Sequence, residues 1–356
     1  MDKKETNHDE DPSGSQTKKK CVNQIFAKMF EDLNKSFYKS STVFKVNVGL
    51  RQSNPDAYTP KIVSIGPNHR KNPQLGPMEE YKLLYLRRFL QRREGLDVKY
   101  WIGLLEDMEE EARMYYDDIE DLDTDEFCKM LLLDGCFVVE FIRERECCQM
   151  SSEILFKIID FVDYKFNQIL RDLLLLENQL PFFILNKLHD LTEQDTGLRL
   201  ETLAITFFSH VVNLGYIYNN RMDLKIFDTE RRDMKHLLEV VHVASCPMNC
   251  MKLSNDINDT KWNKVMPNAT ELSEAGVRFA KVMNHTTSLF NIDFENGLMT
   301  IPYLEVVDST ETLLRNFIAY EQQSIDLGYS YFSDYAIFMD QLIDSDQDVC
   351  FAVKKS

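Results

Sequence analysis

The chain has 356 residues, of which 44% are hydrophobic and 28% are charged, and its formal net charge is −17. The apolar fraction excludes a disordered chain and predicts a sizeable core, in one large domain or in about two or three smaller ones. The acidic balance excludes a general nucleic-acid binder, because no domain-wide basic surface is available to displace phosphate counterions.

The first part of the chain predicts a leader followed by one helical domain. Residues 1–20 contain no apolar run, which excludes a secretory signal or a membrane-spanning helix there and predicts a disordered leader. The predicted domain then covers residues 21–356. Apolar residues at spacings of three and four predict an amphipathic helix over 22–40. Alternating residues over 43–48 predict a short strand or extended segment, and the Pro, Asn and Gly content of 54–77 predicts a structured loop.

The middle of the chain is predicted to be helical. Pro77 opens a helix with acidic residues at its start and arginines near its end, in agreement with the helix dipole, and Gly95 is its expected end. Pro181 should interrupt the helix before it, because proline disfavours helical backbone in the preceding residue. Further helices are expected over 98–119, 125–143, 203–214 and 231–242. Residues 153–189 are expected to form two helices, the second over 168–180. An exposed connection is expected over 246–268, and two later helices are expected, one after Ser309 and one over 331–343.

The C-terminal part changes to the period of a β-strand. Residues 277–282 and 289–294 are predicted strands, and the following Asn296 and Gly297 form the strongest hairpin-turn signal in the chain. The predicted fold class is therefore mainly α, a multi-helix globular domain with a small antiparallel β-sheet or hairpin near residues 277–301.

Motifs of known catalytic or nucleotide-binding chemistry are missing from the sequence. The twelve glycines are scattered singly, so neither GxGxxG nor GxxxxGK[ST] occurs. No serine lies between two glycines as a nucleophile elbow requires, and HExxH is absent. The acids are too many for a catalytic pair to be assigned. These observations predict no catalytic residue and no cofactor.

An acidic block is the most conspicuous charge feature. Twelve carboxylates and a single base, Arg113, occupy residues 106–126. A calcium loop beginning at Asp121 would have Glu126 at its sixth position and Leu132 at its twelfth, so the required glycine and bidentate glutamate are both missing. We interpret the block as a solvated acidic face, with a surface for a basic partner and a metal site as the alternatives.

Cysteine and histidine spacing offers one further metal hypothesis. His242, Cys246 and Cys250 lie four residues apart, but Pro247 interrupts a helix there and no nearby residue completes a zinc set, which favours ordinary packing. The eight cysteines are few and irregularly spaced, so reduced thiols are expected. No metal site is predicted.

Four polar residues in apolar surroundings are the candidate site residues. Asp134 and Glu140 flank an otherwise apolar segment, and Glu177 and Asn178 interrupt an apolar helix. Polar groups at such places normally find partners, so we expect them to join caps or turns in the interior. The alternative is that they converge in a pocket.

Six segments, in order along the chain, carry a family resemblance. They are residues 54–69 (NPDAYTPKIVSIGPNH), 78–87 (MEEYKLLYLR), 130–140 (MLLLDGCFVVE), 172–183 (DLLLLENQLPFF), 269–279 (ATELSEAGVRF) and 308–322 (DSTETLLRNFIAYEQ). Together they make a specific match over residues 44–355. They resemble one plant family, called domain of unknown function 247 and also uncharacterised protein family 0481.

The resemblance implies a mainly helical plant protein that usually carries one C-terminal transmembrane helix and is placed at the plasma membrane. This chain stops at Ser356, before such a helix would appear, so as written it is expected to be soluble and cytoplasmic. The family offers no established catalytic residues to carry over. Some members in grasses resemble pollen-side determinants of self-incompatibility.

Two functions of different classes follow. The first is a non-enzymatic recognition or signalling protein that binds unknown protein partners, with self-incompatibility as one form of that role. The second is an enzyme of unrecognised type, in which the four candidate residues would line a pocket. A membrane scaffold is a third reading, which the missing terminal helix weakens.

Overall fold

The computed structural model divides into two units, Met1–Ser41 and Thr42–Ser356. In the first unit a short helical stretch, residues 26–30, exposes Phe26, Met29 and Phe30. The predicted leader over 1–20 lies outside the described residues. The structure describes residues 26–30, 42–93, 95–117, 119, 122–146, 165–193, 197–209, 233–247, 266–282, 288–324 and 327–353.

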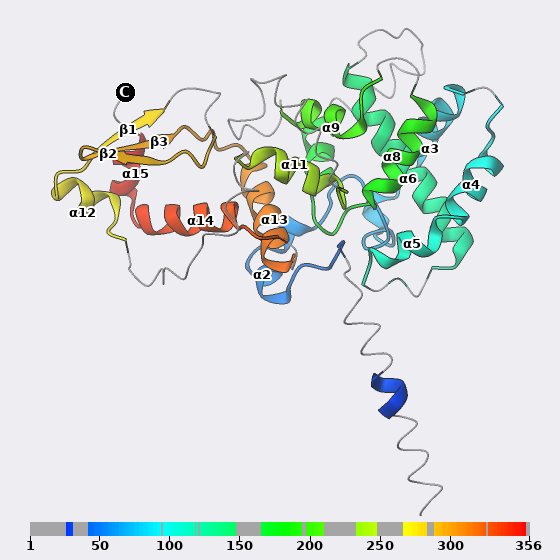
Figure 1. Cartoon of the computed structure of the whole chain (residues 1–356), viewed down its shortest axis with the longest axis horizontal. Helices are drawn as coiled ribbons and strands as arrows, with labels where there is room; N and C mark the ends of the chain where they lie inside the picture. Colours follow the sequence, from blue (N-terminus) through cyan, green and yellow to red (C-terminus); the bar gives the residue numbers. More distant parts are fainter. Residues whose placement is uncertain are drawn as a thin grey trace, which may run out of the picture. The chain divides into compact units, whose positions relative to one another are not determined.

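The second unit is built around one long helix, α6 (Thr124–Glu146). Buried residues occur on every side of it, from Phe127 to Ile142, as expected for a helix that is surrounded by others. A Cβ atom on Gly135 would lie 2.5 Å from Leu188, so glycine allows close approach of the neighbouring helix. Figure 1 shows the neighbours of α6, which are α3 (Pro77–Gln91), α4 (Val98–Glu106), α5 (Glu109–Met114), α8 (Phe182–Thr192) and α9 (Leu200–Ser209).

Helix ends follow the local signals where those signals are strong. Proline at the first position and two early glutamates start α3, as predicted. The predicted helix over 98–119 is divided into α4 and α5. The helix predicted over 168–180 ends early: residues 165–173 are helical, and the chain then turns before Pro181 and α8. Side chains of that turn bind distant backbone groups, which replaces the helical hydrogen bonds there.

The segment before α3 has little regular structure. It contains α2 (Val48–Ser53), the short 3-10 helices η1 (Pro55–Tyr58) and η2 (Pro73–Leu75), and one isolated bridge between Val43 and Tyr116. Residues 61 and 62 form bends, and residues 63–65 belong to no helix or sheet. This agrees with the predicted structured loop. We call residues 42–69 the strap.

The C-terminal part combines helices with one small sheet (Figure 1). A second, smaller apolar cluster lies between the sheet and its helices, around Met299 and Leu342. The elements are α11 (Leu237–Ser245), α12 (Ala269–Glu274), β1 (Arg278–Val282), β2 (Asp293–Glu295), β3 (Leu298–Pro302), α13 (Thr310–Gln323), α14 (Tyr331–Leu342) and α15 (Asp346–Val353).

The sheet has the strand order β1-β3-β2. Its β2–β3 hairpin turns at Asn296 and Gly297, whose φ angles are 51° and 72°, as a two-residue type I′ turn requires. The mainly α fold with a small sheet near residues 277–301 is therefore confirmed. The sheet is mixed, however, because β1 joins β3 in parallel. Leu289 and Phe290, expected in a strand, instead pack into the core, where the Phe290 ring contacts Phe332.

In the described part of the chain, none of the helices is both long and apolar enough to cross a membrane.

Candidate functional site

A single buried carboxylate, Asp172, holds residues 61–63 of the strap. Its Oδ2 atom accepts hydrogen bonds from the backbone N–H groups of Lys61 (2.9 Å), Ile62 (2.6 Å) and Val63 (3.1 Å). Arg171 donates to Oδ1 at 2.8 Å. Burial raises the pKa of Asp172, and the three N–H donors oppose that shift. The carboxylate thus supplies the acceptor that these three consecutive amides would otherwise lack.

Asn178 continues the same arrangement. Its Oδ1 accepts from Ile65 N at 2.7 Å, and its Nδ2 donates to the carbonyls of Val63 (3.0 Å) and Asp172 (2.9 Å). Gln179 next to it donates to two carbonyls of its own turn and accepts from Leu238 N at 3.0 Å. These amides fix the turn before Pro181 against both the strap and the start of α11.

Asp134 and Lys82 form a buried ion pair beside the strap. Lys82 Nζ lies 2.6 Å from Asp134 Oδ1 and also donates to Ser64 O at 2.6 Å, while Gly66 N donates to Asp134 Oδ2 at 2.9 Å. Burial lowers the pKa of Lys82, but the Asp134 and Glu79 carboxylates outweigh it and raise the pKa overall. The pair therefore binds strap backbone through both of its charges.

Gly66 lies where the strap comes closest to the helical core. Its φ is +75°, and an added Cβ would lie 2.6 Å from Gln179 O. The same carbonyl accepts a hydrogen bond from the Tyr116 hydroxyl at 3.0 Å. Only glycine fits here without displacing backbone.

Glu177 closes the network at the surface end of the strap. Its carboxylate accepts from Val46 N at 2.7 Å, pairs with Arg51, and lies 3.1 Å from His69 Nε2. Burial raises the pKa of Glu177, but the hydrogen bonds from His69, Arg51 and Val46 outweigh it and lower the pKa overall. Glu177 is therefore held as a carboxylate.

Glu140 belongs to a different network, on the other side of α6. It accepts from Arg92 Nε at 2.6 Å and from Arg143 Nη1 at 3.1 Å. Arg143 also donates to the ring of His189, whose Nε2 lies 2.8 Å from Leu198 O. Burial and the Arg143 charge lower the pKa of His189. Its proton is therefore on Nε2, and the ring links α6 to the chain before α9.

The structure thus brings three of the four candidate residues together along the strap and leaves the fourth apart. Asp134, Glu177 and Asn178 all bind strap backbone, whereas Glu140 binds arginines. The groups that these residues contact are main-chain amides and charged side chains of the protein itself. The arrangement serves to fix a segment with little regular structure onto the helical core.

Sequence reasoning missed Lys82 and Glu321 as buried charges, although a signal was present. Met78, Lys82, Tyr85 and Phe89 are the buried residues of α3, and their spacing of three and four marks Lys82 as a core position. Glu321 follows Phe317 by four residues on α13 in the same way. A charged residue in an apolar stripe predicts a buried partner.

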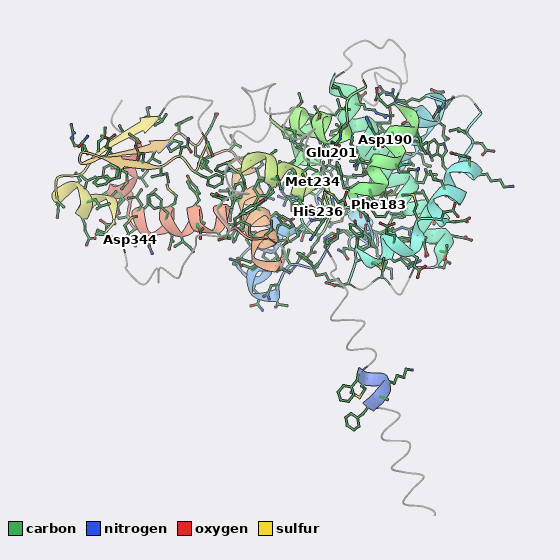
Figure 2. All side chains as sticks on the ribbon, in the orientation of Figure 1. Phe183, Asp190, Glu201, Met234, His236 and Asp344 are labelled. Atoms are coloured by element: carbon green, nitrogen blue, oxygen red, sulfur yellow. The ribbon has the colours of Figure 1, made fainter. Side chains whose placement is uncertain are left out.

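Glu321 joins three helices. Its Oε1 lies 2.9 Å from His242 Nε2 on α11 and accepts from Phe332 N at 2.9 Å, and its Oε2 accepts from Ser333 N at 2.8 Å. The carboxylate therefore sits on α13, binds α11 and caps the first turn of α14. His236, which is labelled in Figure 2, is the N-cap of α11. Its ring lies 5.1 Å from the ring of Tyr320.

The three residues of the metal hypothesis are not brought together as a ligand set in the described part of the chain. His242 binds Glu321, Cys246 is a buried thiol, and Cys250 lies outside the described residues. Across the described ranges, no group of three or more His, Cys, Asp or Glu side chains could hold a metal ion.

An exposed acidic surface covers the end of α4, all of α5 and the start of α6. We call it the acidic face. The only base of this block, Arg113, is turned inward: it pairs with Glu109, donates to Leu122 O at 2.8 Å and lies 4.5 Å over the Phe127 ring. The acidic face consists of Glu106, Asp107, Glu110, Glu111, Asp117, Asp123 and Asp125.

The comparison with known families decides the identity. The model of the family DUF247, described as a plant protein of unknown function, matches residues 43–356. The chain belongs to the DUF247 family. The resemblance noted in the sequence is thereby confirmed, and the match begins at the second residue of the strap.

Two curated DUF247 relatives come from Arabidopsis thaliana. The UPF0481 protein At3g47200 is 27% identical over 335 residues, which cover 88% of this chain and 67% of the relative. The putative UPF0481 protein At3g02645 is 25% identical over 392 residues, covering 86% of this chain and 73% of the relative. No solved structure matches this chain.

Proposed function

We propose that this DUF247 protein is a non-enzymatic recognition or signalling protein of plants that acts through protein–protein contacts, with self-incompatibility as one form of that role. The polar groups of the interior support this, because each candidate residue is engaged in holding the fold. The enzyme alternative required these four to converge in a pocket, and no observation on them favours it.

The acidic face is the observation that carries the proposal. Carboxylates are concentrated on adjoining elements, and Arg113 is engaged on the inner side, so negative charge predominates on the face. Such a surface attracts a positively charged partner and raises its association rate. We therefore assign the face to a protein partner with a basic surface.

The partner should bind through charge, so its affinity should depend on salt. A charge-reversed protein, Glu110→Lys with Glu111→Lys, removes negative charge at the centre of the acidic face. A matched control, Glu274→Lys with Asp340→Lys, changes the net charge equally at exposed sites on α12 and α14. Both variants have the same net charge, so any difference between them reports the position of the charges.

The experiment is a pull-down from plant tissue extract with the full chain as bait, at low and at physiological salt. The proposal expects a partner that the original protein and the control retain, that the acidic-face variant loses, and that salt weakens. It is overturned if no specific partner is retained at either salt, or if both variants retain the same partner equally.

A further inference from the structure

The two edges of the small sheet differ in how they are protected. At the β2 edge, the strand is only three residues long, and the outward N–H of Phe294 donates to its neighbour's side chain, Asp293 Oδ1, at 2.9 Å. A donor already occupied within its own strand is unavailable to another strand, so this edge is closed.

In the described part of the chain, the β1 edge is open. Arg278 N donates to Gly297 O at 2.9 Å, and Tyr303 N donates to Val282 O at 3.1 Å, which marks both ends of the parallel ladder with β3. Residues 278, 280 and 282 therefore direct their N–H and C=O groups toward β3, and the groups of Phe279 and Lys281 point away from the sheet. No strand in the described part of the chain pairs with that side of β1.

We propose that β1 pairs with β1 of a second copy of this chain, antiparallel and centred on Ala280. In that register Phe279 lies opposite Lys281 of the second copy, and both residues direct their N–H and C=O groups toward each other. Every outward group of both strands is then used. The two sheets then form one continuous sheet across a two-fold axis. Both copies use the same edge in this isologous contact, so the assembly is complete as a dimer.

The side chains of β1 fit this register. A lysine on an edge strand disfavours pairing when the other strand places a second positive side chain directly opposite, because the two charges repel each other. Here Lys281 meets the ring of Phe279, a favourable cation–aromatic contact, and Arg278 meets Val282. Ala280 meets Ala280 at the axis, so small side chains lie where the strands come closest. Like charges are thus never directly opposed.

The self-pairing is independent of the recognition role proposed above, and salt separates the two. Each copy carries a net charge of −17, so two copies repel each other and salt should strengthen their association. Binding of a basic partner to the acidic face should instead weaken with salt. A failure of one proposal therefore leaves the other intact.

A disulfide across the axis tests the register. The Cα atoms of a pair such as Ala280 and its copy lie roughly 4.5 Å apart, within disulfide range. Ala280→Cys should give a reducible cross-linked dimer on a non-reducing gel after mild oxidation. Lys281→Cys should not, because its two copies would lie roughly 8 Å apart. The original chain, oxidised in parallel, reports cross-links through its own cysteines.

The second measurement is the mass in solution by analytical ultracentrifugation. Lys281→Pro removes an outward N–H while leaving every bond between β1 and β3 in place, and should raise the dimer dissociation constant roughly tenfold or more. Lys281→Ala keeps the N–H and should dimerise more nearly like the original chain. The proposal is overturned if the original chain stays monomeric at high concentration and high salt, or if Ala280→Cys cross-links no more than Lys281→Cys.

Discussion

Replacing Asp172 by alanine should destabilise the fold more than removing any exposed acid. The change leaves the N–H groups of Lys61, Ile62 and Val63 without their acceptor. Lys61 is exposed and can bind water, whereas the N–H groups of Ile62 and Val63 lie in partly and fully buried residues. A buried donor without a partner costs roughly 1–3 kcal/mol, so two of them predict a loss of about 2–6 kcal/mol. That is a large part of the stability of an ordinary domain.

The assay is urea unfolding of the full chain, followed by far-ultraviolet circular dichroism at neutral pH. Asp172→Asn keeps one oxygen for the strap and should lose less than Asp172→Ala. Asp190→Ala, at an exposed site on α8 (Figure 2), is the control and should change stability by no more than about 0.5 kcal/mol. The reasoning is refuted if Asp172→Ala unfolds at the same urea concentration as Asp190→Ala.

Three further predictions concern the same interior. Burial lowers the pKa of His236 to about 4, so below about pH 6.5 the unfolded state binds more protons than the folded state. The free energy of unfolding should therefore fall by roughly 3 kcal/mol between pH 6.5 and pH 4. His236→Asn can still cap α11, and its urea unfolding at the two pH values should show a much smaller fall. Glu177 has a lowered pKa, so the stability it contributes is present above the ordinary value of 4.5 and is lost as the pH falls through its folded pKa. Glu177→Gln should be less stable than the original chain at pH 7 and should lose less stability on acidification. Equal acid-unfolding curves for the two proteins would contradict this. Gly66→Ala should lower the free energy of unfolding, measured in urea, by roughly 2 kcal/mol or more. Gly95→Ala should lower it by about 1 kcal/mol, because φ is also positive there but no atom lies near the added Cβ. Equal losses would mean that the contact with Gln179 adds nothing.

The elements that could be predicted from the sequence are those with local signals. Pro77 with its two glutamates marks the start of α3, and the Asn296–Gly297 turn marks the β2–β3 hairpin. Both signals act within a few residues, so no knowledge of distant contacts is needed. The family resemblance likewise depended on short segments and was confirmed over most of the chain.

The features that could not be predicted depend on contacts between distant residues. The turn after residue 173 replaces a predicted helix because Asp172 and Asn178 satisfy strap backbone more than 100 positions away. The parallel pairing of β1 with β3 has the same origin, since nothing near Arg278 indicates its partner. Asp134, Glu177 and Asn178 could be picked out as polar residues in apolar surroundings, but their common target, the strap, has no regular pattern that would reveal it.

The way the strap is held also explains why its sequence is so recognisable. The strap residues that lie outside its helices have no regular neighbour with which to share hydrogen bonds, so their buried amides need side-chain partners. Those partners lie in segments 78–87, 130–140 and 172–183, which are the same segments that carry the family resemblance. A change on either side leaves a buried polar group unpaired, whereas a change on the acidic face leaves only exposed charge altered. A substitution on the acidic face of this chain can therefore change its surface charge without disturbing the strap.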